Sequence, residues 1–253
     1  MAAQRTALVT GAGSGIGKAI ATDLARAGHK VLVTDLNLTA AEAVAESLHQ
    51  EGLAAQGYKL DVSQQSDIDA LVDTVEVDIL INNAGLQYVA KLESFPADKW
   101  RLLTDVLLVG PAMLTRGFLP QMKSRNFGRI VNIGSIHALV ASPYKSAYVA
   151  AKHGLLGFAK VVALETAEFN ITINTICPSY VKTPLVENQI RQQALEHGIS
   201  EADVINNIML EPMPKKAFIE MEELSASVNF LISDAARNMT GQTLVLDGGW
   251  TIR

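Results

Sequence analysis

The chain has 253 residues, a length that suits one large α/β domain with a sizeable core. Its residues are 49% hydrophobic and 19% charged with a net charge of −5, which argues against a disordered chain and against non-specific nucleic-acid binding. The single cysteine, Cys177, excludes an internal disulfide and favours a cytoplasmic protein over a secreted one.

Short apolar runs recur along the chain and predict about seven strands. They lie at Thr6–Thr10, Lys30–Thr34, Gln56–Leu60, Asp78–Asn82, Arg129–Gly134, Ile171–Cys177 and Thr243–Leu246. Because each run is apolar nearly throughout, we expect strands that are covered on both faces, as in a parallel sheet.

Segments with helical periodicity separate these strands. They lie at Ser14–Ala27, Thr39–Glu51, Ser66–Val75, Trp100–Ser124, Ser146–Glu168 and Glu222–Ser233. The alternation predicts an α/β fold, a single domain over residues 1–253 built on a Rossmann-type doubly wound parallel sheet flanked by helices. A polar, helix-prone insertion at about 184–220 breaks the alternation. We expect it to form a helical substrate lid, with a pair of solvated surface helices as the alternative.

The sequence predicts neither a membrane span nor a metal site. No apolar run reaches the ~18 residues of a spanning helix, and the first residues carry no basic leader. No cluster of histidine, cysteine and acidic residues has the spacing of metal ligands. We therefore expect a cytoplasmic protein that binds small molecules, without a nucleic-acid or membrane partner.

A glycine-rich turn, Thr10–Gly17, joins the first predicted strand to the first predicted helix. Glycines let the backbone turn tightly and approach a pyrophosphate, which then faces the positive end of the helix. Asp35 ends the second strand, where a carboxylate can bind the adenine ribose hydroxyls and repel a 2′-phosphate. The pattern therefore favours NAD over NADP. Alternatively, Asp35 caps the turn that follows it.

After the fifth predicted strand, the chain carries three residues whose pattern indicates acid–base chemistry: Ser135, Tyr148 and Lys152. Tyr148 and Lys152 are four residues apart, so they share one face of a predicted helix. An ammonium beside a phenol lowers the pKa of the phenol, which makes Tyr148 a general acid or base. Ser135 can hydrogen-bond the same substrate oxygen. A tyrosine and a lysine at this spacing would otherwise indicate only an amphipathic helix surface.

Together these motifs resemble those of the short-chain dehydrogenase/reductase family over nearly the whole chain. The resemblance rests on the Gly-x-x-x-Gly-x-Gly spacing, the Asn-Asn-Ala-Gly sequence Asn82–Gly85, the pair Asp61-Val62, and the set Ser135, Tyr148 and Lys152. It implies catalysis by that set and a homotetramer assembled through the two long helices. It also implies an NAD site at Gly11, Ser14, Gly15, Ile16, Gly17, Asp35, Asp61, Val62, Asn83, Ala84, Gly85, Tyr148, Lys152, Pro178, Val181 and Thr183.

Within that family the chain is similar to a bacterial subgroup that interconverts (R)-3-hydroxybutyrate and acetoacetate, a small hydroxy acid and its oxo acid. The similarity is carried by Asn82–Gln87, Ser135–Lys152, Ile176–Val186 and Asp247–Thr251. It implies a substrate site made of Gln87, Ser135, His137, Lys145, Tyr148, Gln189 and Trp250. The joint match matters, because singly such polar residues are typical of solvated loops. Tyr180 stands where the subgroup has tryptophan, and Ser179 where the family has glycine.

Leu107 departs from the family pattern, because it replaces an asparagine whose main-chain carbonyl holds a proton-relaying water. Pro111, four residues later, cannot donate a helical hydrogen bond to the Leu107 carbonyl. We hypothesise that Pro111 kinks the helix and leaves this carbonyl free for the relay. The alternatives are an NAD-binding pseudoenzyme with an impaired relay, or a dehydrogenase for another small ketone or hydroxy acid.

Overall fold

A parallel sheet of seven strands forms the centre of the computed structural model, which describes residues 4–252. The strands are β1 (Thr6–Thr10), β2 (Lys30–Asp35), β3 (Ala55–Lys59), β4 (Ile79–Asn82), β5 (Gly128–Ile133), β6 (Ile171–Pro178) and β7 (Thr243–Leu246). Their order is β3-β2-β1-β4-β5-β6-β7, and every neighbouring pair is parallel. The predicted Rossmann-type sheet is therefore confirmed, with its strand order reversing between β1 and β4.

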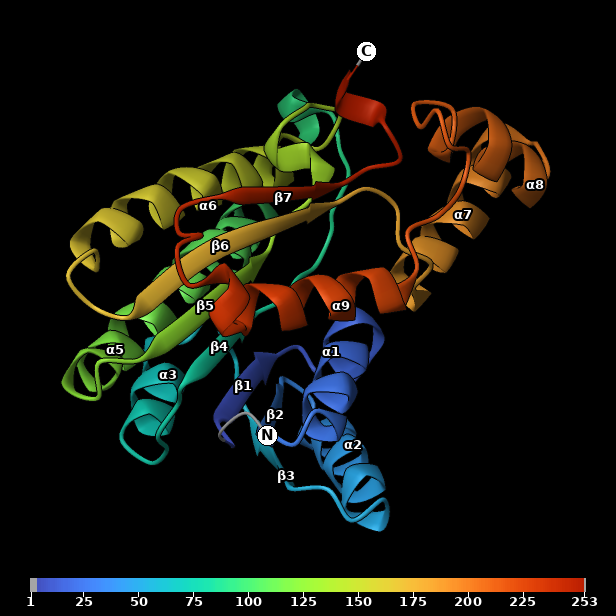
Figure 1. Cartoon of the computed structure of the whole chain (residues 1–253). Helices are drawn as coiled ribbons and strands as arrows, with labels where there is room; N and C mark the ends of the chain where they lie inside the picture. The colour runs from blue at the N-terminus through green and yellow to red at the C-terminus, as the bar shows by residue number, and fades with distance from the viewer. Residues whose placement is uncertain (1–3, 253) are drawn as a thin grey trace.

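Helices cover both faces of the sheet (Figure 1). One face is covered by α1 (Gly15–Arg26), α2 (Leu38–Gln50) and α9 (Met221–Ile232). The other is covered by α3 (Gln65–Val72), α5 (Gly110–Ser124) and α6 (Ser146–Glu165). This double coverage explains why the strands read as continuous apolar runs rather than as alternating ones.

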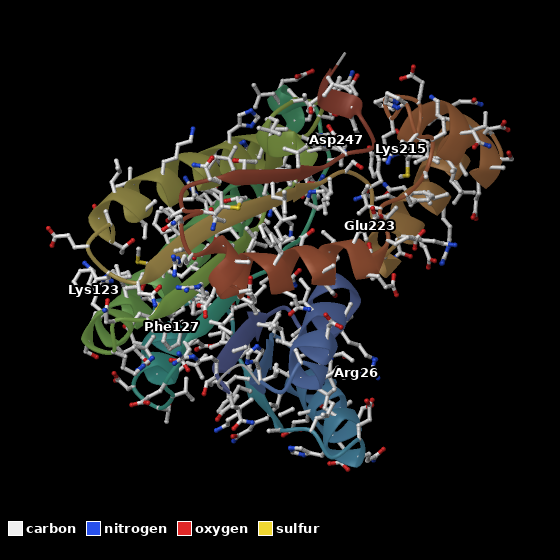
Figure 2. The ribbon with its side chains drawn as sticks, viewed as in Figure 1. Arg26, Lys123, Phe127, Lys215, Glu223 and Asp247 are labelled. Atoms are coloured by element: carbon white, nitrogen blue, oxygen red, sulfur yellow. The ribbon has the colours of Figure 1, made fainter. Side chains whose placement is uncertain are left out.

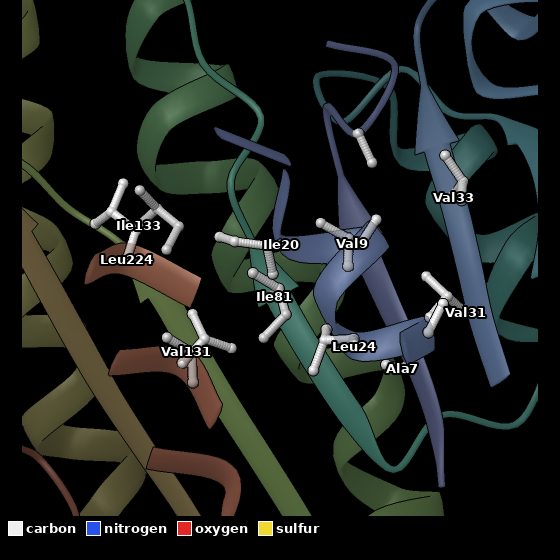
Figure 3. Packing of buried hydrophobic residues seen from close by; sticks show 14 of the residues in the cluster. Ala7, Val9, Ile20, Leu24, Val31, Val33, Ile81, Val131, Ile133 and Leu224 are labelled. Carbon is white, nitrogen blue, oxygen red and sulfur yellow. The ribbon is translucent and has the colours of Figure 1, made fainter. Parts of the chain in front are cut away.

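The α1 face shows how the apolar pattern produces this packing. Ile20 and Leu24 are four residues apart on α1, so they lie on one face of the helix and are each 1% exposed. Figure 3 shows them beside Val9 of β1 and Ile81 of β4. Burying such a side chain stabilises the fold by about 1.5–3 kcal/mol. This packing holds α1 against the sheet, with its N-terminal end at the carboxyl end of β1.

The long helix predicted at Trp100–Ser124 differs from a regular helix. It begins earlier, with α4 (Ala97–Thr104), and a π-helical segment, Asp105–Val109, separates α4 from α5. In this segment the Gly110 N–H donates to the carbonyl of Asp105, five residues back. The distortion lies directly before Pro111, where the sequence predicted an interruption, since proline cannot donate a helical hydrogen bond.

The insertion predicted at about 184–220 is helical. It contains α7 (Pro184–His197), α8 (Glu201–Val204) and a π-helical segment, Ile205–Met209. Figure 1 shows α7 and α8 projecting away from the sheet. Ile190, Val204 and Met209 form a small apolar cluster of their own there, with Tyr180 packed against it. A parallel bridge between Val181 and Ile219 closes the base of the insertion.

Candidate active site

A cavity of about 560 Å³ lies at the carboxyl ends of the strands, where α/β sheets bind their ligands. Most of the predicted site residues line it. They are Gly11, Ser14, Gly15, Ile16, Asp35, Asp61, Val62, Asn83, Ala84, Gly85, Gln87, Ser135, His137, Lys145, Tyr148, Lys152, Pro178, Val181, Thr183 and Gln189. Gly17 and Trp250 are not among the lining residues, and both lie behind the wall.

The glycine turn after β1 has the geometry of a phosphate-binding loop. Gly11 and Gly15 have positive φ angles of 62° and 54°, which side chains disfavour. A Cβ on Gly17 would lie 2.4 Å from the Gly11 carbonyl oxygen, so only glycine lets the turn fold back on α1. The Asn83 side chain donates to the Thr10 carbonyl at 2.8 Å and ties the turn to β4. The open backbone and the start of α1 fit a pyrophosphate.

Asp35 ends β2 at the rim of the cavity. Its carboxylate accepts hydrogen bonds from the backbone N–H groups of Gly13 and Asn37, each at 2.9 Å. The bond to Asn37 is a turn cap, so the capping role considered as an alternative is present as well. Both bonds fix the negative charge beside the glycine turn, where the adenosine ribose of a dinucleotide would bind.

Ser135, Tyr148 and Lys152 are brought together by β5 and α6. Ser135 lies two residues after the end of β5, and its Oγ accepts a hydrogen bond from the His137 N–H at 3.2 Å. Tyr148 and Lys152 lie one turn apart on α6, with the Lys152 Nζ 5.7 Å from the Tyr148 ring centroid. The same Nζ donates to the Ile133 carbonyl at 2.6 Å, which fixes Lys152 against the end of β5. The predicted catalytic set therefore faces one cavity.

The pKa of Tyr148 shifts in the opposite direction to the sequence-based expectation. Burial raises it, and the hydrogen bond with Ser135 only partly opposes that rise. Lys152 does not produce the expected lowering, and its Nζ donates instead to the Ile133 carbonyl. Burial also lowers the pKa of Lys152 to about 8, so this group can exchange a proton near neutral pH. Tyr148 is therefore a neutral phenol that can donate a proton to a carbonyl oxygen.

His137 and Lys145 form the polar end of the cavity. Lys145 Nζ lies 3.2 Å from His137 Nε2 and 5.9 Å from the Tyr180 ring centroid. Burial, reinforced by Lys145, lowers the pKa of His137 to about 4, so the imidazole is neutral at pH 7. Burial also lowers the pKa of Lys145, and an anion bound beside it would favour its charged form. With the amides of Gln87 and Gln189 on the same walls, this end can bind a small anion such as a carboxylate.

The structure adds lining residues that the motifs did not single out as site residues. They are Leu102 and Val106 of the long helix; Tyr180 of the β6 loop, already noted as a departure from the subgroup, also lines the cavity. Helical periodicity cannot distinguish such residues from ordinary core positions. Leu107 also lines the cavity and is 1% exposed, so the position that departs from the family pattern faces the site with an apolar side chain.

No group of three or more His, Cys, Asp or Glu side chains within residues 4–252 is placed to hold a metal ion. The nicotinamide cofactor that the motifs imply fits better, because the glycine turn leaves its backbone open and Asp35 stands at the ribose position.

Comparison with known proteins decides the family. A family model described as short chain dehydrogenase matches residues 5–194. The chain belongs to the short chain dehydrogenase family. D-beta-hydroxybutyrate dehydrogenase of Rhizobium meliloti is 44% identical over 98% of both chains, and the enzyme of that name from Cupriavidus necator is 41% identical over 97% of both.

A solved structure of a short chain dehydrogenase relative, a variant of actinorhodin polyketide ketoreductase with NADPH, superimposes with a TM-score of 0.93. It is 32% identical, and the match covers 99% of both chains. The protein is therefore an oxidoreductase of a family that binds a nicotinamide cofactor.

Proposed function

We propose that this short chain dehydrogenase interconverts (R)-3-hydroxybutyrate and acetoacetate with NAD. The observation that carries the proposal is the placement of Lys145, a cation beside neutral His137 in the cavity that holds Ser135 and Tyr148. A 3-hydroxy acid has its carboxylate two carbons from the reacting carbinol, so one small substrate can meet both groups. The two D-beta-hydroxybutyrate dehydrogenases among the relatives support this substrate class.

The protein's own groups bind, orient and move a proton. Ser135 and Tyr148 hold the substrate oxygen, and Lys145 with Gln87 and Gln189 holds the carboxylate. In the reducing direction Tyr148 donates its phenolic proton to the carbonyl oxygen, and in the oxidising direction the phenolate takes the carbinol proton. Lys152, whose pKa burial lowers to about 8, lies one helical turn away and can pass a proton to or from this centre. The bound nicotinamide supplies the hydride or accepts it. Helix α7, which carries Gln189, closes the site as a lid.

NAD is favoured by the fixed carboxylate of Asp35. Because the N–H groups of Gly13 and Asn37 hold it in place, it cannot swing away from a 2′-phosphate. The repulsion between the two charges at that rim disfavours NADP, whereas the two ribose hydroxyls of NAD can donate to the carboxylate oxygens.

The replacement at Leu107 is compatible with turnover if the proton relay uses backbone groups. Pro111 has no N–H, so it cannot bond to the carbonyls four and five residues before it, those of Leu107 and Val106. We propose that this freed backbone takes part in the relay to Lys152. Pro111→Ala restores a donor and is expected to lower kcat, and a wild-type kcat in that variant would contradict the relay.

We propose a homotetramer in which the outer faces of α5 and α6 form one of the interfaces between copies. Val161 and Leu164 of α6 are 53% and 79% exposed. A hollow of about 360 Å³ between the helices is lined by Leu119 and Phe158, with Lys123 and Glu165 at its rim. Ala97–Ser124 and Ser146–Glu165 are also apolar and long enough to cross a membrane, but both pack on the sheet domain. A second copy, contributing the same apolar and oppositely charged groups, fits this face. Light scattering on a sizing column tests the tetramer.

The first experiment measures initial rates of NADH formation from (R)- and (S)-3-hydroxybutyrate, with NADP and an uncharged secondary alcohol in parallel. Turnover of the R acid with NAD, lost in Tyr148→Phe, is the expected result. Turnover of the uncharged alcohol alone would show that another small carbonyl compound is the substrate. NADH binding without turnover of any compound would indicate a pseudoenzyme.

A further inference from the structure

Trp250 stands behind the polar end of the cavity and contacts two of its walls. Its ring centroid is 6.0 Å from that of His137 in an edge-on arrangement of 83°, and 6.0 Å from that of Tyr180 with the rings at 30°. His137 meets the Tyr148 ring edge-on on another side, at 6.2 Å. His137 and Tyr180 are also the two residues against which Lys145 rests. Trp250 therefore contacts both of the residues that Lys145 approaches.

Asp247 fixes the turn that carries Trp250. One carboxylate oxygen accepts from the Gly249 N–H at 2.8 Å, and the other accepts from the Thr251 N–H at 2.8 Å and its hydroxyl at 2.7 Å. Gly248 and Gly249, which lie between Asp247 and Trp250, have positive φ angles of 58° and 92°, a backbone conformation that residues with side chains rarely adopt. Asp247 is itself 9% exposed, so its charge is satisfied inside the protein rather than by water.

The same turn is bonded to the base of the helical insertion. The Lys215 N–H donates to the Gly248 carbonyl at 3.1 Å, and Met213 and Pro214 pack against the two glycines. Figure 2 shows Asp247 and Lys215 at this junction, between the end of β7 and the insertion. The turn is thus held on both sides, which makes it a rigid support for the Trp250 ring.

We propose that Asp247 and Trp250 are positioning residues for the carboxylate end of the substrate. Asp247 locks the turn, the turn sets Trp250, and Trp250 holds His137 and Tyr180 so that Lys145 faces the cavity. This inference deepens the proposed function and rests on it for the identity of the anion. It assigns a role to the C-terminal turn that needs no contact between Trp250 and the substrate.

The test compares Asp247→Ala, Asp247→Asn and Trp250→Leu with Ile252→Ala, a matched control whose side chain in the same turn is 85% exposed. We expect Asp247→Ala and Trp250→Leu to raise KM for (R)-3-hydroxybutyrate about tenfold, with kcat and the NADH Kd within about threefold of wild type. Asp247→Asn keeps one accepting oxygen, so its KM lies between those of wild type and Asp247→Ala. KM for an uncharged alcohol stays within about twofold in every variant.

Tryptophan fluorescence reads the turn without any substrate. In a Trp100→Phe background, which leaves Trp250 as the remaining tryptophan of the chain, Asp247→Ala is expected to shift the emission to the red as the ring meets water. A red shift with an unchanged KM for the acid would overturn the positioning role, because the turn would have moved without consequence. An unchanged emission would overturn the lock by Asp247. Absence of acid turnover in the wild type contradicts the proposed function instead, and the emission then still decides whether Asp247 holds Trp250.

Discussion

Lys145→Met tests the assignment of the substrate carboxylate most directly. Methionine keeps most of the length of the apolar stem, so the variant removes the ammonium that lies 3.2 Å from His137 Nε2 and little packing. A hydrogen bond between charged groups contributes about 1.5–3 kcal/mol, and each 1.4 kcal/mol is a factor of ten. We therefore expect kcat/KM for (R)-3-hydroxybutyrate to fall about 10- to 150-fold.

The loss is expected in KM rather than in kcat, because Lys145 holds the carboxylate equally in the ground state and the transition state. Initial rates over a range of acid concentrations at saturating NAD measure both constants, and an uncharged secondary alcohol serves as the second substrate. Lys99→Met, on the exposed side of α4, is the matched control. An unchanged KM for the acid, or an equal loss for the acid and the alcohol, would refute the assignment of Lys145 to the carboxylate.

Three further predictions concern His137, the glycine turn and Asp35. Burial lowers the pKa of His137 from its ordinary 6.5 to about 4, so the unfolded chain binds more protons in that window and stability falls as the pH falls through it. Urea unfolding should show that His137→Gln loses about 2 kcal/mol less stability than wild type between pH 7 and pH 5, and an equal loss in both proteins would contradict a neutral buried imidazole. Gly17→Ala places a Cβ 2.4 Å from a carbonyl oxygen and should weaken NADH binding at least about tenfold in a fluorescence titration, with Lys18→Ala unaffected. Asp35→Ala should raise the ratio of kcat/KM for NADP to that for NAD about tenfold, and an unchanged ratio would show that this carboxylate does not select the cofactor.

The sequence predicted the sheet and the cofactor turn well, because both depend on local patterns. Buried parallel strands are recognisable as apolar runs, and the structure changes their bounds by only a few residues, as where β2 extends to include Asp35. The glycines of Thr10–Gly17 report backbone conformation directly, since Gly11 and Gly15 adopt the positive φ angles that favour glycine. Parallel strands end at one edge, so motifs far apart in the chain meet there.

Other features of the site could not be derived from spacing. The pKa of Tyr148 depends on how deeply the phenol is buried and on where the Lys152 ammonium points, and neither is encoded in a four-residue interval. Trp250 follows a turn whose direction is set by Asp247 and two glycines, so its position behind His137 depends on tertiary contacts. The resemblance to known enzymes placed it in the substrate site without distinguishing contact from support.

The π-helical segment Asp105–Val109 has a consequence for how the chain tolerates change. An α-helix advances about 100° per residue, so one residue added to a regular helix would rotate everything that follows by about that angle, whereas a wider π-helical turn accommodates the extra residue. Leu114, Phe118 and Met122, which are fully buried against the sheet, follow the segment and owe their inward orientation to it. Making the segment α-helical without removing a residue would turn this apolar row by about that angle toward solvent, whereas deleting one residue as well would keep the row facing the sheet. The segment that forms the cavity wall at Leu107 therefore also determines which side of α5 faces the sheet.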